Sequence, residues 1–184
     1  MGLSRKLQEI VDDISSHREA VLKEVEGLSQ SQLEFKAADD QWSISDVLHH
    51  LALADEANVK LFTLMNAQAR ERDLPKDATP DESELGCLNH IKQTASARAT
   101  APERVAPRTH LPASESLARL GAARGKLLDI VGQISGYDLA HLTFPHPFFK
   151  DLNGYQWLLI AGWHEGRHLA QIGRIKSQPG FPAG

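Results

Sequence analysis

Cysteine is almost missing from this sequence, which contains one, Cys87, among 184 residues. A lone cysteine excludes a disulfide within the chain and is typical of a reducing compartment, so we expect a cytoplasmic protein. Long apolar runs are missing as well, since no stretch approaches the roughly 20 apolar residues of a membrane-spanning helix. The first segment, MGLSRKLQEIVDDI, is amphipathic and acidic, unlike a secretion signal. We therefore expect no membrane partner.

An excess of positive charge is also lacking. The chain has 20 Lys and Arg residues against 24 Asp and Glu residues, which gives a net charge of -4. Proteins that bind nucleic acids usually carry the opposite balance, so we expect no nucleic-acid partner. The hydrophobic share of 41% is that of an ordinary globular protein, and the length suits one domain that spans residues 1–184.

No clear strand pattern stands out, and apolar residues instead recur at helical spacing in four segments. Helices are expected at 3–26, at 44–69, at 113–134 and from about Asn153 to the start of the tail SQPGFPAG. Gly27 is expected to end the first helix, and Ser43 or Ser45 to cap the second. Four long amphipathic helices predict an all-α four-helix bundle.

The connection over residues 70–112 is unusually long and contains five prolines. A compact domain rarely has so long a segment without structure, so we expect a short helix over 82–97. The segment APERVAPRTHLP, at 101–112, is expected to form an extended strap over one end of the bundle. A connection of this length allows a crossover that leaves the second and third helices parallel.

Two histidines of the last helix, His164 and His168, are four residues apart. At about 100° per residue they lie about 40° from each other, on the same face as the apolar residues. Burying two titratable rings in an apolar face is costly unless a partner satisfies them. Two imidazoles one turn apart can share a divalent metal ion, so the pair indicates part of a metal site.

A third ligand is expected from the second helix, which contains the adjacent residues His49 and His50. Phased on Val47, Leu51 and the apolar positions that follow, His50 points inward and His49 points to solvent. Asp46, one turn earlier, either orients His50 or simply stabilises the start of the helix. Three histidines leave a coordination position open, which is typical of a catalytic metal, and zinc or nickel is the expected ion.

The string HEGRH, at 164–168, also matches the H-E-x-x-H pattern of zinc proteases, with Glu165 as general base. Such proteases take a third ligand further along the chain. Residues 169–184 contain no His, Asp, Glu or Cys. The pattern is therefore a weak indication of a protease, although Glu165 and His146 remain candidates for proton transfer.

Arg124 lies near the centre of the apolar stripe of the third predicted helix, between Leu120 and Leu127. One interpretation is that it pairs with an inward acid or a carbonyl. The other is that it binds a substrate carboxylate or a cofactor near the metal.

Three motifs resemble the DinB-like superfamily of metal-binding four-helix bundles, which includes bacillithiol and mycothiol S-transferases. They are WSISDVLHHL at 42–51, APERVAP at 101–107 with the Arg124 helix, and HPFFKDLNGYQWLLIAGWHEGRHLAQI at 146–172. The resemblance covers nearly the whole chain and implies an up-down-down-up topology, a metal held by His50, His164 and His168, and a homodimer. It does not imply one reaction.

Three functions remain open at this point. The first is a metal-dependent enzyme that ionises a low-molecular-weight thiol for S-transfer to an electrophilic small molecule. The second is a metal-dependent hydrolase in which the metal acidifies a water molecule. The third is a metal-stabilised stress or binding module without turnover.

Overall fold

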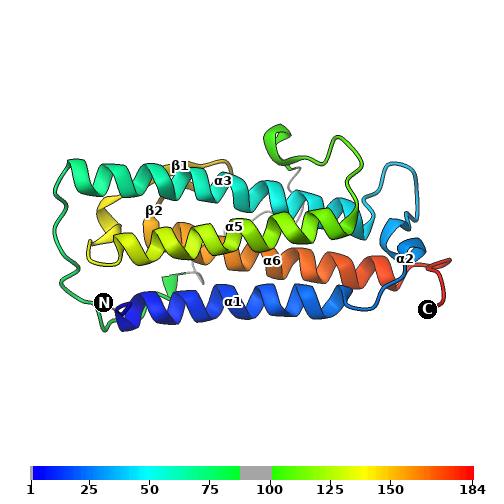
Figure 1. The fold of residues 1–184 in the computed structure, drawn as a ribbon, viewed down its shortest axis with the longest axis horizontal. Coiled ribbons are helices and arrows are strands. Elements are labelled where there is room, and N and C mark those ends of the chain that lie inside the picture. The colour runs from blue at the N-terminus through cyan, green and yellow to red at the C-terminus, as the bar shows by residue number, and fades with distance from the viewer. Residues whose placement is uncertain (1, 88–100) are drawn as a thin grey trace.

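The computed structural model describes residues 2–87 and 101–184, and four long helices run along its length (Figure 1). They are α1 (Arg5–Val25), α3 (Ile44–Glu71), α5 (Ala113–Ile134) and α6 (Gly154–Lys176). Their bounds lie within two residues of the four predicted helices, because a periodic apolar face is a strong local signal. The predicted all-α four-helix bundle is confirmed.

The chain directions give the predicted up-down-down-up order. In Figure 1, α1 and α6 run one way along the bundle, while α3 and α5 run the other way. Side-chain pairs confirm that α3 and α5 are parallel, because Glu56 binds Arg119 and Asn66, further along α3, binds Gln133. Two parallel neighbours require the long connection between residues 71 and 113.

Capping residues explain where three helices begin. The Ser43 hydroxyl accepts a hydrogen bond from the Asp46 N–H, and Asp46 accepts one from the Ser43 N–H, so the pair forms a capping box. Asn153 and Gln156 form the same box at α6, and Ser4 caps α1. Asp46 therefore stabilises the start of α3, which is the simpler of its two interpretations.

Glycines let α1 and α6 approach each other closely. A Cβ atom at Gly162 would lie 3.1 Å from the Ile14 Cα, and one at Gly166 would lie 3.0 Å from the His17 ring. No larger residue fits at Gly162 without moving the backbone of α1. The glycines thus make α1 and α6 one tightly packed pair, beside the pair α3 and α5.

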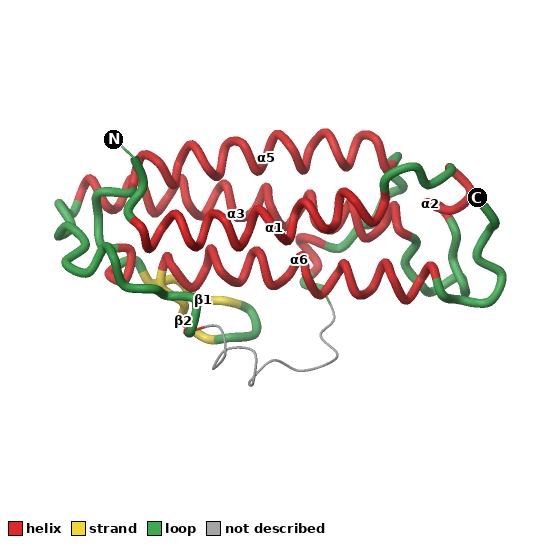
Figure 2. The backbone as a smooth tube through the Cα atoms, turned by 90° about the horizontal axis from the view of Figure 1, so that it is seen from below, coloured by secondary structure: helices red, strands yellow, loops and turns green. Residues whose placement is uncertain are grey.

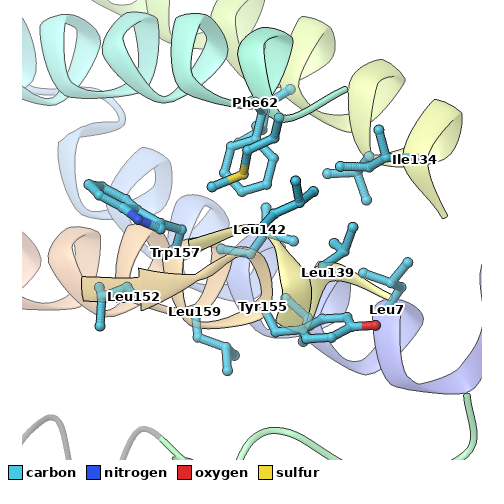
Figure 3. Packing of buried hydrophobic residues seen from close by; sticks show 14 of the residues in the cluster. Leu7, Phe62, Ile134, Leu139, Leu142, Leu152, Tyr155, Trp157 and Leu159 are labelled. Atoms are coloured by element: carbon cyan, nitrogen blue, oxygen red, sulfur yellow. The ribbon is translucent and has the colours of Figure 1, made fainter. Parts of the chain in front are cut away.

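The apolar core consists of two clusters, one toward each end of the bundle. The first includes Leu7, Phe62, Ile134 and Trp157, and the second includes Val21, Val47, Leu120 and Ile172. Figure 3 shows part of the first cluster, in which labelled side chains from all four long helices, Leu7, Phe62, Ile134 and Trp157, lie around Leu142.

A β-hairpin precedes α6 and was not predicted. Strand β1 (Thr143–His146) pairs antiparallel with β2 (Lys150–Asn153), with Phe144 opposite Leu152. Pro145 and the shortness of both strands concealed the pattern, although proline is compatible with an edge strand. Figure 2 shows the hairpin on the outside of the helices, next to the start of α6.

The remaining elements are short. Helix α2 (Gln30–Glu34) follows α1, and two 3₁₀ turns, η1 (Glu103–Val105) and η2 (Leu139–His141), lie in the later connections. The predicted strap at 101–112 thus contains η1, which contacts α3. Most of the predicted helix at 82–97 lies outside the described residues. None of the helices in the described parts of the chain combines the length and the hydropathy of a membrane span.

Candidate metal centre

The three predicted histidines meet at one point. The Nε2 atom of His164 lies 3.1 Å from the Nε2 atom of His50 and 3.1 Å from that of His168. One ligand nitrogen from each ring lies within 4.8 Å of the other two. His50 comes from α3 and the other two rings from α6, so this cluster joins the two tightly packed helix pairs.

Hydrogen bonds to the far side of two rings determine how they face the cluster. The His50 Nδ1 lies 2.7 Å from the carbonyl oxygen of Val105, and the His168 Nδ1 lies 2.8 Å from the Gln171 Oε1. Both oxygens can only accept, so each Nδ1 carries the proton and each Nε2 presents a lone pair. Lone pairs that converge from neutral imidazoles are what a divalent cation requires, and these residues therefore fit a metal ion.

The three rings are held in the neutral form that metal binding requires. Burial lowers the pKa of His50, despite the opposing effect of the Val105 carbonyl. Burial, followed by the charges of His168 and His50, holds the pKa of His164 well below 6.5. Burial and His50 lower the pKa of His168 to about 4. The cluster thus does not repel a cation at neutral pH.

A cavity of about 940 Å³ opens beside the cluster. Its apolar wall includes Trp42, Phe144, Phe149, Trp157 and Trp163. The Trp42 ring stacks on His168 with centroids 6.4 Å apart, so the cluster lies directly at the wall of the cavity. A space of this size accommodates a small-molecule ligand.

His146, the predicted proton-transfer candidate on the hairpin, lines the same cavity as the three imidazoles. Its ring lies 4.8 Å from those of Phe149 and Trp157, measured between centroids. The Phe148 N–H donates to its Nδ1, which leaves the proton of the neutral ring on Nε2. Burial, and then the charge of Arg104, lower the pKa of His146 to about 4.

The orientation predicted for His49 is wrong. His49 is 6% exposed, and its Nδ1 is buried without a hydrogen-bond partner among the described residues. The sequence phasing included Ala54, Asn58 and Leu61, which line the cavity and are only partly buried. The true buried face is rotated toward Ala52 and Asp55, and this rotation covers His49 while His50 still points inward.

Glu165 lies away from the imidazoles, in a buried network of charges, and does not line the cavity. Arg18 donates from Nε and Nη2 to its two carboxylate oxygens, at 3.1 and 2.6 Å, and Arg124 also donates to it. Arg18 further donates to Asp55 at 2.8 Å. This placement gives Glu165 no path to a ligand in the cavity, so the proton-transfer role considered for it has no geometric support.

Arg124 pairs with an inward acid and a backbone carbonyl, as the first of its two interpretations predicted. It donates to Glu165 and to the Ile14 carbonyl, and it does not line the cavity. Arg18 makes the reciprocal contact, because it donates to the Leu120 carbonyl, one turn before Arg124. The structure therefore offers no support for Arg124 as a ligand-binding residue.

Arg18 and Asp55 were missed in the sequence, although a signal for them exists. Each charged residue of the network lies four positions, about one helical turn, after a buried apolar residue. The pairs are Ile14 and Arg18, Leu51 and Asp55, Leu120 and Arg124, and Ala161 and Glu165. One charge per helix, two of each sign, at core-facing positions predicts a buried neutral network.

Comparison with known proteins now identifies the family. A model of the DinB superfamily matches residues 13–172, which is most of the chain. The chain belongs to the DinB superfamily. The resemblance found in the three sequence motifs is thereby confirmed.

Two curated DinB relatives match most of the chain. The uncharacterised protein YuaE of Bacillus subtilis strain 168 is 31% identical over 156 residues, which are 84% of this chain and 90% of that protein. A protein of Geobacillus thermodenitrificans strain NG80-2, named a putative metal-dependent hydrolase, is 25% identical over 179 residues, 96% of this chain and 89% of that protein.

Two solved structures share the DinB fold. The four-helix bundle protein TT2238 aligns with a TM-score of 0.60 and 23% identity, over 91% of this chain and 98% of its own. YfiT from Bacillus subtilis, described as a probable metal-dependent hydrolase with an unusual four-helix bundle topology, aligns with a TM-score of 0.55 and 19% identity over 92% and 85%. At these identities the likeness concerns the fold alone.

Proposed function

We propose that this DinB protein is a metal-dependent enzyme acting on a small molecule, with a divalent cation held by His50, His164 and His168. The observation that carries the proposal is the convergence of three neutral imidazoles at the wall of a large cavity. Three protein ligands leave a further coordination position for a ligand, which is typical of catalytic sites.

The protein side chains would divide the work at this site. Val105 and Gln171 hold two of the imidazoles in the tautomer that binds a cation. A bound divalent cation would supply Lewis acidity, which lowers the pKa of a coordinated nucleophile. His146 also lines the cavity, and we propose that its neutral Nε2–H donates a hydrogen bond to the substrate. A pKa of about 4 and an Nδ1 that already accepts from Phe148 do not favour the proton transfer predicted for it.

Hydrolysis is the reaction we place first. It is supported by the name of one relative, the putative metal-dependent hydrolase of Geobacillus thermodenitrificans, and YfiT, which shares the fold, is likewise described as a probable metal-dependent hydrolase.

Thiol S-transfer is the second candidate, and it is favoured because the described cavity lining offers no free carboxylate base. Among the described residues, the one carboxylate that lines the cavity is Glu56, and Arg119 neutralises it through two hydrogen bonds of 2.7 and 2.8 Å. A water nucleophile benefits from a free carboxylate base, whereas a thiol is far more acidic and needs less help.

The metal assignment is tested by elemental analysis of purified protein. We expect about one zinc or nickel ion per chain, as for a three-histidine site. His50→Ala and His164→Ala should each weaken binding at least about tenfold, because each removes one of three ligands. His141→Ala is the matched control, since this histidine is exposed and does not line the cavity. Equal metal retention in all three variants would refute the site.

The reaction is tested with ester, amide and electrophile panels, each with and without added low-molecular-weight thiols. Turnover without thiol that stops when the metal is removed supports hydrolysis, and turnover that also requires thiol supports S-transfer. If metal removal lowers the melting temperature and no panel reacts, the protein is a metal-stabilised module and the proposed enzyme function is wrong. Sedimentation on the same samples tests the homodimer implied by the family resemblance.

A further inference from the structure

We propose that the cavity selects ligands with an anionic group joined to an apolar or aromatic body, and that Arg104 and Arg167 recognise the anion. This inference rests on the proposed function, because it concerns the substrate class of the same site. It replaces Arg124, the arginine that the sequence suggested for this task, with two arginines that line the cavity.

The charge of the cavity is opposite in sign to that of the whole molecule. The chain carries a net charge of -4. The cationic side chains that line the cavity are Lys60, Arg104, Arg167 and Arg174. The single lining carboxylate, Glu56, is already bound by Arg119, which does not line the cavity. An anion that enters is therefore attracted by several cations and repelled by no free carboxylate of the described lining.

These four cations have charge available for a ligand, because the acids described near them are paired elsewhere. Within residues 2–87 and 101–184, none of the four cationic lining residues forms a salt bridge. The neighbouring acid on the strap, Glu103, pairs with Arg108, so it does not compete for Arg104. An arginine without a partner retains its full capacity to bind a carboxylate or phosphate in the bidentate manner.

Arg167 and Arg104 approach the metal cluster from two different elements. Arg167 lies on α6 between the two helical ligands, and its guanidinium carbon lies 5.0 Å from the centre of the Trp163 ring, in a cation–π contact. Arg104 lies on η1, next to the residue whose carbonyl orients His50. Both arginines can thus bind one ligand that also reaches the cluster.

The rest of the lining determines the body of the ligand. All three tryptophans of the chain, Trp42, Trp157 and Trp163, line this cavity, together with Phe144 and Phe149. Aromatic walls favour an apolar or aromatic partner that can stack on them. A carboxylate or phosphate monoester that carries such a group satisfies both the walls and the arginines.

The test uses two probes of equal shape, 4-phenylbutanoate and its neutral amide, 4-phenylbutanamide. Binding is followed by tryptophan fluorescence, because every tryptophan lines the cavity. We expect the carboxylate to bind about tenfold more tightly, as charge-assisted hydrogen bonds are stronger than neutral ones. The measurement is made on metal-loaded and on metal-stripped protein, because a carboxylate could also prefer the cation itself.

Two comparisons decide the outcome. The preference should survive metal removal, should fall to about threefold or less in the double variant Arg104→Gln/Arg167→Gln, and should persist in Lys126→Gln, an exposed cation on α5. The double variant should keep its metal, so a loss of anion preference there is distinct from a failure of the metal site. A preference that disappears with the metal, or that survives in the double variant, overturns the inference.

Salt provides a check on the unmodified protein, which does not depend on the folding of any variant. Raising the ionic strength from about 0.01 M to about 1 M shortens the screening length from about 30 Å to about 3 Å. Binding of 4-phenylbutanoate should weaken several-fold, while binding of the amide should not weaken. Equal responses of the two probes would also overturn the inference.

Discussion

Glu165 immediately follows a proposed metal ligand, yet its carboxylate contacts two guanidinium groups and no imidazole. On a helix, successive residues point about 100° apart, so neighbours in sequence face different surroundings. His164 faces the cavity, and Glu165 faces the interior between the two helix pairs. At the scale of single residues, the network of Arg18, Asp55, Arg124 and Glu165 is therefore structural, because its charges satisfy one another between the helices that hold the cluster.

Substitution of Arg124 by methionine tests this structural role. Arg124→Met leaves part of the charge of Glu165 buried without its partner, and it removes the bond to the Ile14 carbonyl. Breaking a buried ion pair from one side costs about 3–5 kcal/mol, so we expect Arg124→Met to lower the free energy of unfolding by about that amount. Urea denaturation measures this loss.

The matched control for Arg124 is Arg119, which also lies on α5 and also binds a glutamate. Its ion pair with Glu56 is far more exposed, at 32% and 36% for the two side chains. Arg119→Met should therefore cost less than about 1 kcal/mol. Equal losses in the two variants would show that the buried network has no special weight in the stability of the bundle.

At the scale of elements, the close contact between α1 and α6 depends on the absence of a side chain. Gly162 lies against the backbone of Ile14. About one turn further along the same two helices, Arg18 of α1 donates to Glu165 of α6 in the charged network. A wider separation of α1 and α6 would lengthen the contacts of that network. The same glycine lies two residues before His164, about 200° around the helix, so the helix contact and the metal ligand occupy nearly opposite faces of α6.

A pair of glycine substitutions on α6 tests this contact. Gly162→Ala places a Cβ 3.0–3.1 Å from Ile14 atoms, including its Cα, and we expect this overpacking to cost about 1–3 kcal/mol. Gly173→Ala meets no atom within 4 Å and should instead gain about 0.5–1 kcal/mol, because alanine restricts the unfolded chain. Thermal or urea unfolding measures both. If both variants are stabilised, the helices do not meet as closely as described.

At the scale of the whole molecule, one buried cluster ties the start of the long connection to two helices. Asp77 accepts hydrogen bonds from the Lys6 ammonium of α1 at 3.1 Å and from the Tyr155 hydroxyl of α6 at 2.9 Å. The Lys6 N–H also donates to the Pro80 carbonyl. These contacts fasten the first part of the crossover to the end of the bundle that is remote from α2.

The charge of Asp77 predicts a loss of stability in acid. Burial raises its pKa, but hydrogen bonds from the Thr79 N–H, Tyr155 and Lys6 outweigh burial and lower the pKa below 3.8. A group with a lowered pKa in the folded state stabilises the fold above its unfolded pKa, and this contribution disappears as the pH falls through the folded pKa. The urea midpoint should therefore decrease below about pH 4.

Substitution of Asp77 by asparagine isolates this effect. Asp77→Asn should lower the urea midpoint at neutral pH and make its decrease in acid shallower than in the unmodified protein. Asp39→Asn, at an exposed turn position, provides the control and should preserve the unmodified profile. An unchanged acid profile in Asp77→Asn would show that this carboxylate does not contribute to the pH dependence.

Local patterns account for what could be predicted of the fold. The four long helices follow from apolar residues at helical spacing, and their starts follow from residues such as Ser43 and Asn153. The hairpin at 143–153 was missed because two four-residue strands, one with a proline, carry too little periodicity.

Helix geometry relates the residues of one element, so the spacing of the histidines was enough to place His164 and His168 on one face and to point His50 toward the bundle interior. Contacts between elements were needed to learn that His49 is buried, that Glu165 and Arg124 bind each other, and that Arg104 and Arg167 line one cavity. The spacing of apolar residues along a helix indicates which face is apolar. Whether that face meets a neighbouring helix, a buried charge or a cavity depends on residues far away in the chain, and only packing brings them together.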